Sequence, residues 1–393
     1  MSYQKTMVVE AANAARQSAM SSEERLQATI AFKPVDRLVC GPFVYGYAAS
    51  FAGITQARFI NDFDLAQLCM DKLKAAYPIW DLYRSSFADL GYGPTLRQRW
   101  FQKVALPGDE LPEDAPYQIL EGVLATQEEL RAIKTQGLQK YMIAVTKRIR
   151  PNKGLIHFLL WESRRNKLHK RDVAAAHKRG QAFHYGGTYA PPFELLSMTR
   201  SMVEFNKDMY RLKDELVEVM WAMQKESIEM AVKSCKGSGV PRVFVVGCRC
   251  GTTILNKKYF ETYSWPFIKD GALKLIERGI TPIFHLDTDW GRALEYFLQL
   301  PKHKCIIETD GATDLFKARD ILKDHMVLSG DVPASLLTVA SASEVEEYSR
   351  KLILAMAKTG GYIFSNGCTM PSNSRHENVR AMFETVERCG RYD

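Results

Sequence analysis

The sequence lacks several features that would fix a class at once. It has no run of about 18 apolar residues, the length that crosses a membrane, and residues 1–26 hold no stretch suited to a signal peptide. A cytoplasmic location is therefore expected. The eight cysteines are then expected to be reduced. Because their spacing is irregular and none forms a CxxC pair, most are expected to be buried. The GxGxxG and Walker motifs of nucleotide-binding folds are also missing.

The composition is that of a globular protein. Of its 393 residues, 46% are hydrophobic and 25% are charged, so a core can form without disulfides. The formal charge of +8 comes largely from residues 147–179. This basic region is expected to be a solvated surface, with docking of an acidic partner or anionic ligand as the alternative. No helix-turn-helix, zinc-finger or RNA-binding signature accompanies it, so no nucleic-acid partner is expected.

Helix signals dominate the first half of the chain. Residues 1–36 are expected to form an N-terminal helical extension, since "SSEERLQATIAF" has a Ser N-cap with Glu at capping-box distance. The next stretch, "DRLVCGPFV", predicts the first strand. Residues 209–234 predict one long amphipathic helix whose Met and Trp positions recur at core spacing.

The second half repeats a strand followed by a helix five times. Such units predict a parallel sheet covered by helices, and short apolar strands suit a sheet buried on both faces. The preferred fold is α/β, a (β/α)8 TIM barrel forming a single domain over residues 37–393. A doubly wound open sheet is the alternative, weakened by the missing GxGxxG and Walker motifs. The five predicted strands are "RVFVVGC", "TPIFHLD", "KCIIETD", "MVLSGDV" and "GYIFSNGC".

Potential ligands gather at the ends of these strands, which form the active-site face of a barrel. His285, Glu308 and Cys368 make a plausible zinc set with an open fourth position. Asp287 shares strand parity with His285, so it is either a fourth ligand or a group that orients the imidazole. The spacing alone leaves a second interpretation open, in which these are buried structural polar residues.

Other polar residues have ordinary interpretations. Cys248 and Cys250 flank a strand end and are expected to be packed, with pocket lining as the alternative. Asp331 is expected to cap the following helix. Asp289 and Asp310 either bind substrate or accept from backbone amides. Four histidines are expected at the surface or in loops: His157, His169, His177 and His184.

Several of these stretches are similar to a known family. "ILNKKYFETYSWPFIK", "FHLDTDW", "SGDVPASLL" and, above all, "GGYIFSNGCTMPSNSRHENVRAMFETV" resemble the uroporphyrinogen decarboxylase superfamily, in its corrinoid-dependent methyltransferase branch. The resemblance runs from about residue 185 to the end of the chain, and more loosely over "SSEERLQATIAFKPVDRLVCGPF". The arginine-rich opening of the decarboxylase itself has no counterpart here, because residues 41–55 are aromatic and neutral.

The resemblance implies a zinc site. In that branch a His-x-Cys pair, a late cysteine and a glutamate hold the metal, and His285, Glu308 and Cys368 match three of these positions. Asp287 replaces the first cysteine, and oxygen donors fit a metal that acts as a Lewis acid on oxygen. All four residues are thus expected to be catalytic.

The implied activity is that of an O-demethylase methyltransferase. It would move a methyl group from a methoxylated, aromatic substrate to the cob(I)alamin of a separate corrinoid protein, because no DxHxxG cobalamin motif is present. Residues 147–179 are a candidate docking surface, and a homodimer is left open. The alternatives are methyl transfer from a methylcorrinoid to a thiol or folate, a decarboxylase-like lyase, and a barrel that only binds a corrinoid or tetrapyrrole.

Overall fold

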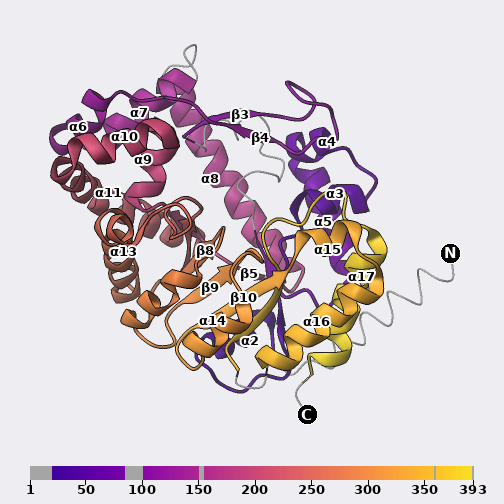
Figure 1. Cartoon of the computed structure of the whole chain (residues 1–393). Helices are drawn as coiled ribbons and strands as arrows, with labels where there is room; N and C mark the ends of the chain where they lie inside the picture. Colours follow the sequence, from indigo (N-terminus) through magenta and orange to yellow (C-terminus); the bar gives the residue numbers. More distant parts are fainter. Residues whose placement is uncertain (1–19, 85–100, 150–154, 358–359, 392–393) are drawn as a thin grey trace. The chain divides into compact units, whose positions relative to one another are not determined.

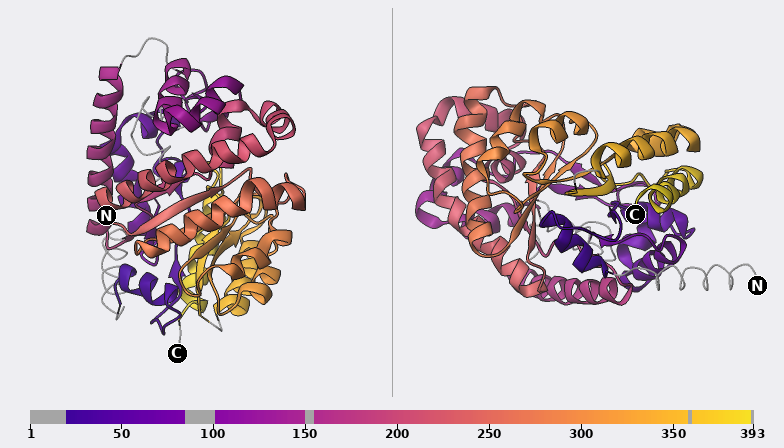
Figure 2. Two further views of the ribbon diagram at one scale, coloured as in Figure 1. Left: turned by 90° about the vertical axis from the view of Figure 1, so that its left-hand side faces the viewer. Right: turned by 90° about the horizontal axis from the view of Figure 1, so that it is seen from below.

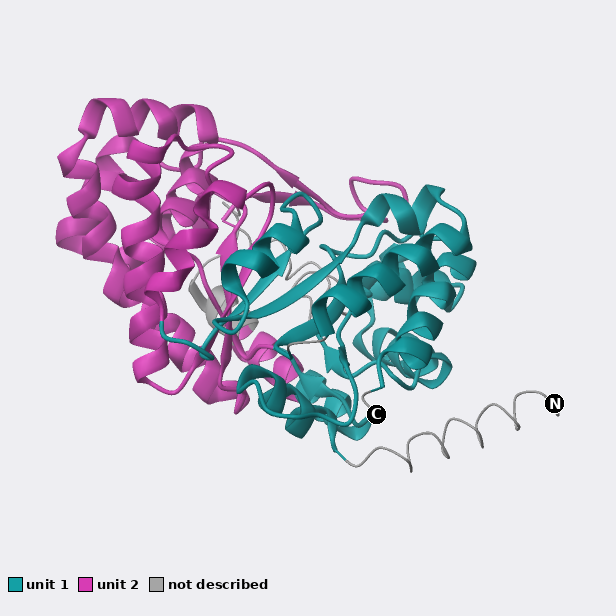
Figure 3. Cartoon of the chain, turned by 60° about the horizontal axis from the view of Figure 1, so that its bottom comes forward, with its two compact units in different colours: residues 1–91, 171–184, 301–393 teal, residues 92–170, 185–300 magenta. Residues whose placement is uncertain are grey.

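The computed structural model describes residues 20–84, 101–149, 155–357 and 360–391 (Figure 1). The chain divides into two compact units, each described here by itself (Figure 3). Unit 1 comprises residues 1–91, 171–184 and 301–393, and unit 2 comprises 92–170 and 185–300. Helix α8 (Leu155–Lys178) begins in unit 2 and ends in unit 1. None of the helices in the described ranges combines the length and the apolar character that crossing a membrane requires.

Unit 1 is built on parallel strands. Four of them pair in the order β1-β11-β10-β9, with Val39 opposite Ile363 and Ser329 opposite both Ile363 and Glu308. All residues of these four strands are buried, as expected of a sheet covered on both faces. A further parallel pair joins β2 to β5. The strands are β1 (Val39–Cys40), β2 (Leu82–Tyr83), β5 (Ala182–Phe183), β9 (Ile306–Thr309), β10 (Val327–Val332) and β11 (Tyr362–Asn366).

Helices follow most strands of unit 1, and α16 packs along α17 (Figure 1). Helix α16 begins at a capping box in which Ser341 and Glu344 satisfy each other's backbone amides. The helices are α2 (Ser22–Ile30), α3 (Tyr45–Phe51), α4 (Gln56–Asn61), α5 (Phe63–Ala76), α14 (Leu315–Leu322), α15 (Ala334–Val339), α16 (Ala342–Met356) and α17 (His376–Cys389).

The described part of the predicted N-terminal extension is helical and belongs to unit 1. Ser21 caps α2 and forms the expected capping box with Glu24. Arg25 of this helix is buried and pairs with Asp36 at 2.6 Å and with Asp81 at 2.7 Å. Buried ion pairs of this kind tie the helix to the unit. The boundary at residue 36 and the single domain over 37–393 stay predictions.

Unit 2 has three parallel strands in the order β6-β7-β8 and a separate antiparallel pair, β3-β4. The register sets Val246 opposite His285 and Gly247 opposite Leu286. Apart from Thr188, Phe244 and Thr281, the residues of β6, β7 and β8 are buried. The strands are β3 (Lys103–Ala105), β4 (Gln118–Leu120), β6 (Gly187–Tyr189), β7 (Arg242–Gly247) and β8 (Thr281–Leu286).

Helix α11 packs along β6 and against α6 and α13 within unit 2 (Figure 2). The single helix predicted over residues 209–234 is wrong, because Lys213 adopts a positive φ of 48° and separates α10 from α11. The helices are α6 (Gln127–Gln136), α7 (Leu138–Ile149), α9 (Pro192–Arg200), α10 (Met202–Leu212), α11 (Asp214–Ser238), α12 (Lys257–Tyr259), the π-helix η2 (Phe260–Ser264), α13 (Trp265–Glu277) and the 3₁₀ helix η3 (Gly291–Gln299).

Candidate functional site

The carboxyl end of β8 brings together two of the predicted ligands in unit 2. Nε2 of His285 lies 3.3 Å from Oδ1 of Asp287. The His285 ring is buried and stacks on Phe244 with ring centroids 5.0 Å apart. Asp287 is half-buried, and its backbone amide donates to the carbonyl of Gly247 on β7. Stacking therefore orients the His285 ring, and pairing with β7 fixes the backbone of Asp287.

A buried carboxylate anchors the neighbouring loop after β7. Glu194 lies on α9 and is fully buried, and its Oε1 accepts from the backbone amides of Arg249 at 2.6 Å and Cys250 at 3.0 Å. Burial raises the pKa of Glu194 to about 7, the two amides oppose that rise, and the charge of Asp287 adds to it. Glu194 therefore anchors the backbone of Arg249 and Cys250 in this loop.

Packing joins the loops that follow β7 and β8. A Cβ added to Gly251 would stand 2.8 Å from the Trp290 ring, so only glycine permits this close approach. Trp290 donates from Nε1 to the carbonyl of Asp287 at 2.9 Å, and the Thr253 hydroxyl donates to the carbonyl of Asp289 at 2.7 Å. The two loops therefore form one edge of unit 2, which carries Asp287.

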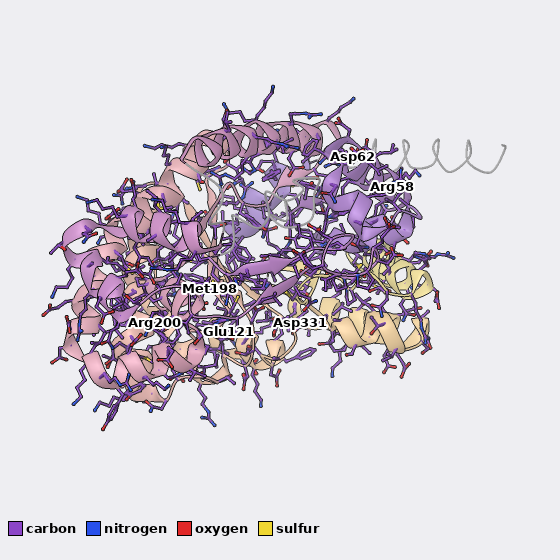
Figure 4. All side chains as sticks on the ribbon, turned by 90° about the horizontal axis from the view of Figure 1, so that it is seen from above. Arg58, Asp62, Glu121, Met198, Arg200 and Asp331 are labelled. Carbon is purple, nitrogen blue, oxygen red and sulfur yellow. The ribbon has the colours of Figure 1, made fainter. Side chains whose placement is uncertain are left out.

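Arg249 lies on this edge with a half-buried guanidinium. Its Nη1 donates to Oε1 of Glu121 at 3.2 Å and approaches the Ser197 carbonyl at 3.4 Å. The same Glu121 oxygen accepts from the amide of Met202, at the start of α10. Figure 4 labels Glu121. Within the described ranges, Nε and Nη2 of Arg249 donate to no protein atom.

In unit 1, Glu308 on β9 lies in a buried network of charged groups. Its Oε1 is 2.5 Å from Nη1 of Arg84 and 2.8 Å from Nε2 of His184. Arg84 also donates to the Gly41 carbonyl at 2.9 Å and lies over the Phe43 ring, 3.7 Å from its centroid. Each member of the Arg84–Glu308–His184 triad is at most 2% exposed. Arg84 directly follows β2, His184 directly follows β5, and Glu308 lies near the carboxyl end of β9.

Cys368 follows β11 in the same unit and is exposed. The side chain of Asn366 positions this segment, since its Nδ2 donates to the Cys368 carbonyl at 2.6 Å while its Oδ1 accepts from the Phe43 amide at 2.8 Å. The Met370 amide in turn donates to the Phe43 carbonyl at 2.7 Å. The thiol is therefore held at a strand end by the segment that follows β1.

Several ordinary interpretations can be compared with these contacts. Asp289 and Asp310 accept from the backbone amides of Gly291 and Ala312, one of the two roles expected of them. The helix cap expected of Asp331 is wrong, because its buried carboxyl accepts from the Tyr348 hydroxyl at 3.0 Å instead.

The expectation for His184 is wrong, whereas those for the cysteines agree with the structure. His184 is buried and not at the surface, because its Nε2 contacts the buried carboxylate of Glu308. His177 is exposed and His169 half-buried, while the side chain of His157 lies outside the described residues. All eight cysteines are free and five are buried, as expected. Cys250 is one of the buried five, and Cys248 is half-buried.

The donors at these strand ends fit zinc. His285 offers a ring nitrogen, Asp287 a carboxylate oxygen and Cys368 a sulfur, which are the three ligand types that zinc accepts. Two ligand atoms about 2.0–2.2 Å from one tetrahedral ion are about 3.3 Å apart, which matches the separation of His285 Nε2 and Asp287 Oδ1, 3.3 Å. Glu308 differs, since its Oε1 already has two basic partners.

The chain belongs to the uroporphyrinogen decarboxylase family. The family model described as Uroporphyrinogen decarboxylase (URO-D) matches residues 173–389, more than half of the sequence and all five of the later strand–helix units. No curated protein matches the chain.

Among solved structures, the chain is similar to a methyltransferase from Methanosarcina mazei. The TM-score is 0.68 at 13% sequence identity, and the match covers 94% of this chain and 99% of the other. Identity at this level carries information about the fold alone. The fold is a TIM barrel, so the predicted (β/α)8 architecture with N-terminal helices is confirmed.

Four residues of the site were missed in the sequence: Arg84, His184, Glu194 and Asn366. Each acts through a partner far away in the chain, such as Glu308 for Arg84. One signal could have found Glu194, because a carboxylate in the otherwise apolar "PPFELL" is unusual for a buried helix start.

Proposed function

We propose that this chain is a zinc-dependent methyltransferase of an O-demethylase system. It moves a methyl group from a methoxylated, aromatic substrate to the cob(I)alamin of a separate corrinoid protein. The observation that carries the proposal is the His285–Asp287 pair at the carboxyl end of β8, at a separation that suits two ligands of one ion. The similarity to a structure named a methyltransferase supports the reaction class.

We assign the metal to His285, Asp287 and Cys368. The carboxyl ends of the strands of a TIM barrel carry its active-site residues, and each of these three residues lies at or just after the carboxyl end of β8 or β11. Zinc bound there would supply Lewis acidity that offsets the charge developing on the ether oxygen. Ligation by Glu308 stays a prediction, but it would compete with the buried ion pair to Arg84. The triad therefore serves better as a buried structural network of unit 1.

Neighbouring groups orient the proposed metal ligands. Stacking of Phe244 fixes the His285 ring, and the Asn366 side chain fixes the backbone of Cys368. The transfer breaks the methyl–oxygen bond and forms a carbon–cobalt bond with the electron pair of cob(I)alamin. The oxygen leaves with the pair of the broken bond and takes up a proton. The aromatic, neutral segment at residues 41–55 supports an aryl substrate.

The partner is proposed from the absence of a cobalamin motif in this sequence. Residues 147–179 are the candidate docking surface, although part of their charge is paired locally: Arg148 with Glu129, Arg171 with Asp64 and Arg179 with Asp71. A cytoplasmic location and a homodimer stay proposals.

The test is methyl transfer with purified components. Zinc-loaded protein, a corrinoid protein reduced to the cob(I)alamin state and an aryl methyl ether are mixed, and the cob(I)alamin absorbance and the phenol product are followed. Loss of that absorbance together with equimolar phenol is expected. A zinc-loaded protein that transfers no methyl group from any aryl ether would contradict the proposal. Methylcorrinoid with thiols or folates tests the reverse direction.

A second candidate is a decarboxylase-like lyase, which the name of the matching family favours. Residues 41–55 contain no arginine or lysine that would pair with a polycarboxylate substrate. Carbon dioxide release from a porphyrinogen polycarboxylate by metal-free protein would bring this candidate forward.

A further inference from the structure

The guanidinium of Arg249 has an open hydrogen-bonding edge. Nη1 is occupied by Glu121, whereas Nε and Nη2 donate to no atom of the described protein. The Glu121 side chain is 46% exposed, so its ion pair with Arg249 is weak and compensates the charge of the guanidinium only in part. The planar fork made by Nε and Nη2 matches the two oxygens of a carboxylate.

Arg249 is close in the chain to a residue that pairs with Asp287, one of the predicted metal ligands of unit 2. Arg249 comes two residues after Gly247, whose carbonyl accepts from the Asp287 amide. Two residues of chain span at most roughly 7 Å. The contact of Gly251 with Trp290 keeps the two loops together. Arg249 and Asp287 therefore belong to the same edge of unit 2, and a benzene ring with an ether at one end and a carboxylate at the other offers one group to each.

Glu194 fixes the backbone from which Arg249 projects. Its Oε1 accepts from the amides of both Arg249 and Cys250, and it is fully buried. Two charge-assisted hydrogen bonds to adjacent amides leave the loop little freedom. Glu194 is therefore a positioning residue that acts through Arg249.

We infer that Arg249 is the specificity determinant of the site and binds a carboxylate on the substrate. The substrate class is then an aryl methyl ether that carries a carboxylate, bound with the ether toward His285 and Asp287 and the carboxylate on the Nε–Nη2 edge. This inference rests on the proposed function for the identity of the ether, while the anion preference itself rests on Arg249.

The experiment measures binding by calorimetry, without a corrinoid protein. The probes are para-methoxybenzoate and para-methoxybenzamide, which have nearly the same shape and differ in charge. The wild type is expected to bind the acid more tightly than the amide by at least about tenfold, the value of a charge-assisted hydrogen bond. Arg249→Gln should abolish this preference. Arg292→Gln, at an exposed position on η3, is the matched control and should keep the preference.

Glu194 is tested by two variants that separate positioning from folding. Glu194→Ala should reduce the preference, and Glu194→Gln should restore it, because the glutamine Oε1 still accepts from both amides. Their unfolding transitions are recorded alongside. Equal affinity of the wild type for acid and amide, or an undiminished preference in Arg249→Gln, overturns the inference.

Methyl transfer is measured separately with both probes. Selective binding without any methyl transfer contradicts the proposed function and leaves the anion subsite standing. Transfer from acid and amide at equal kcat/KM supports the proposed function and overturns the subsite.

Discussion

At the scale of single residues, Glu308 belongs to a buried ion-pair network, and removing one partner from such a network destabilises the folded protein. Its carboxylate pairs with Arg84 and His184 where none of the three is more than 2% exposed. Removing one member of a buried ion pair leaves the other charge without compensation, and this costs far more than losing a surface pair. The triad is therefore a structural requirement of unit 1.

Glu308→Gln should lower the free energy of unfolding by about 3–5 kcal/mol, because Arg84 would remain buried and charged. Urea denaturation measures this change. Glu215→Gln is the control, since its pair with Arg131 is largely solvent-exposed and its loss should cost about 0–1 kcal/mol. Similar losses in the two variants would contradict the role assigned to the triad.

Asp331 predicts a pH dependence of stability. Burial raises its pKa from 3.8 to about 7, against the hydrogen bonds from Tyr348 and Thr309. The folded protein thus holds this proton more tightly than the unfolded chain. The contribution is fully present below about pH 4 and is lost as the pH rises through about 7.

The measurement compares the free energy of unfolding of wild type and Asp331→Asn from pH 5 to pH 8. The variant should gain on the wild type as the pH rises to about 7, by up to roughly 1.4 kcal/mol for each pH unit, because only the folded wild type holds the proton there. Parallel pH profiles for the two proteins would show that the carboxyl titrates as in the unfolded chain.

The sequence predicted His285 and Asp287 as neighbours because the predicted strand "TPIFHLD" gives the two positions the same parity. In the structure the strand ends one residue before Asp287, and the two side chains still meet. It could not predict the partners of Glu308, since Arg84 and His184 are more than a hundred residues away in the chain. His184 was misjudged for this reason. The basic residues that precede it in the sequence indicated a surface position, but the ring is buried against the carboxylate of Glu308.

At the scale of elements, the loops after β7 and β8 depend on one close approach, between Gly251 and the Trp290 ring. Strand and loop positions in this half of the chain follow from sequence, because short apolar runs ending in polar residues are a strong signal. The break at Lys213 could not be predicted, since the amphipathic pattern continues across it and the positive φ belongs to one residue.

Gly251→Ala should destabilise the protein by about 1–3 kcal/mol, because the added methyl would overpack the indole. It should also weaken zinc binding, since Trp290 holds the Asp287 carbonyl. Chemical denaturation and zinc titration measure the two effects. Gly237→Ala, at an exposed helical position with nothing near its Cβ, should be neutral or stabilising by up to about 1 kcal/mol. An equally mild Gly251→Ala would mean that the two loops are independent.

At the scale of the whole molecule, the TIM barrel was predictable because the strand–helix unit recurs five times in the second half of the chain. The first half was harder to read, since β1, β2 and β5 have two residues each and give no periodic signal. The domain limits and the docking role of residues 147–179 stay predictions. The central claim is that strand ends in different parts of the chain hold one zinc ion.

Elemental analysis of zinc in the purified, reconstituted protein tests that claim most directly. The wild type should contain near-stoichiometric zinc, and both His285→Ala and Cys368→Ala should lose most of it. Cys389→Ala, a half-buried cysteine at the end of α17, is the matched control and should keep its zinc. A wild type without zinc after reconstitution, or full zinc content in both ligand variants, would contradict the account.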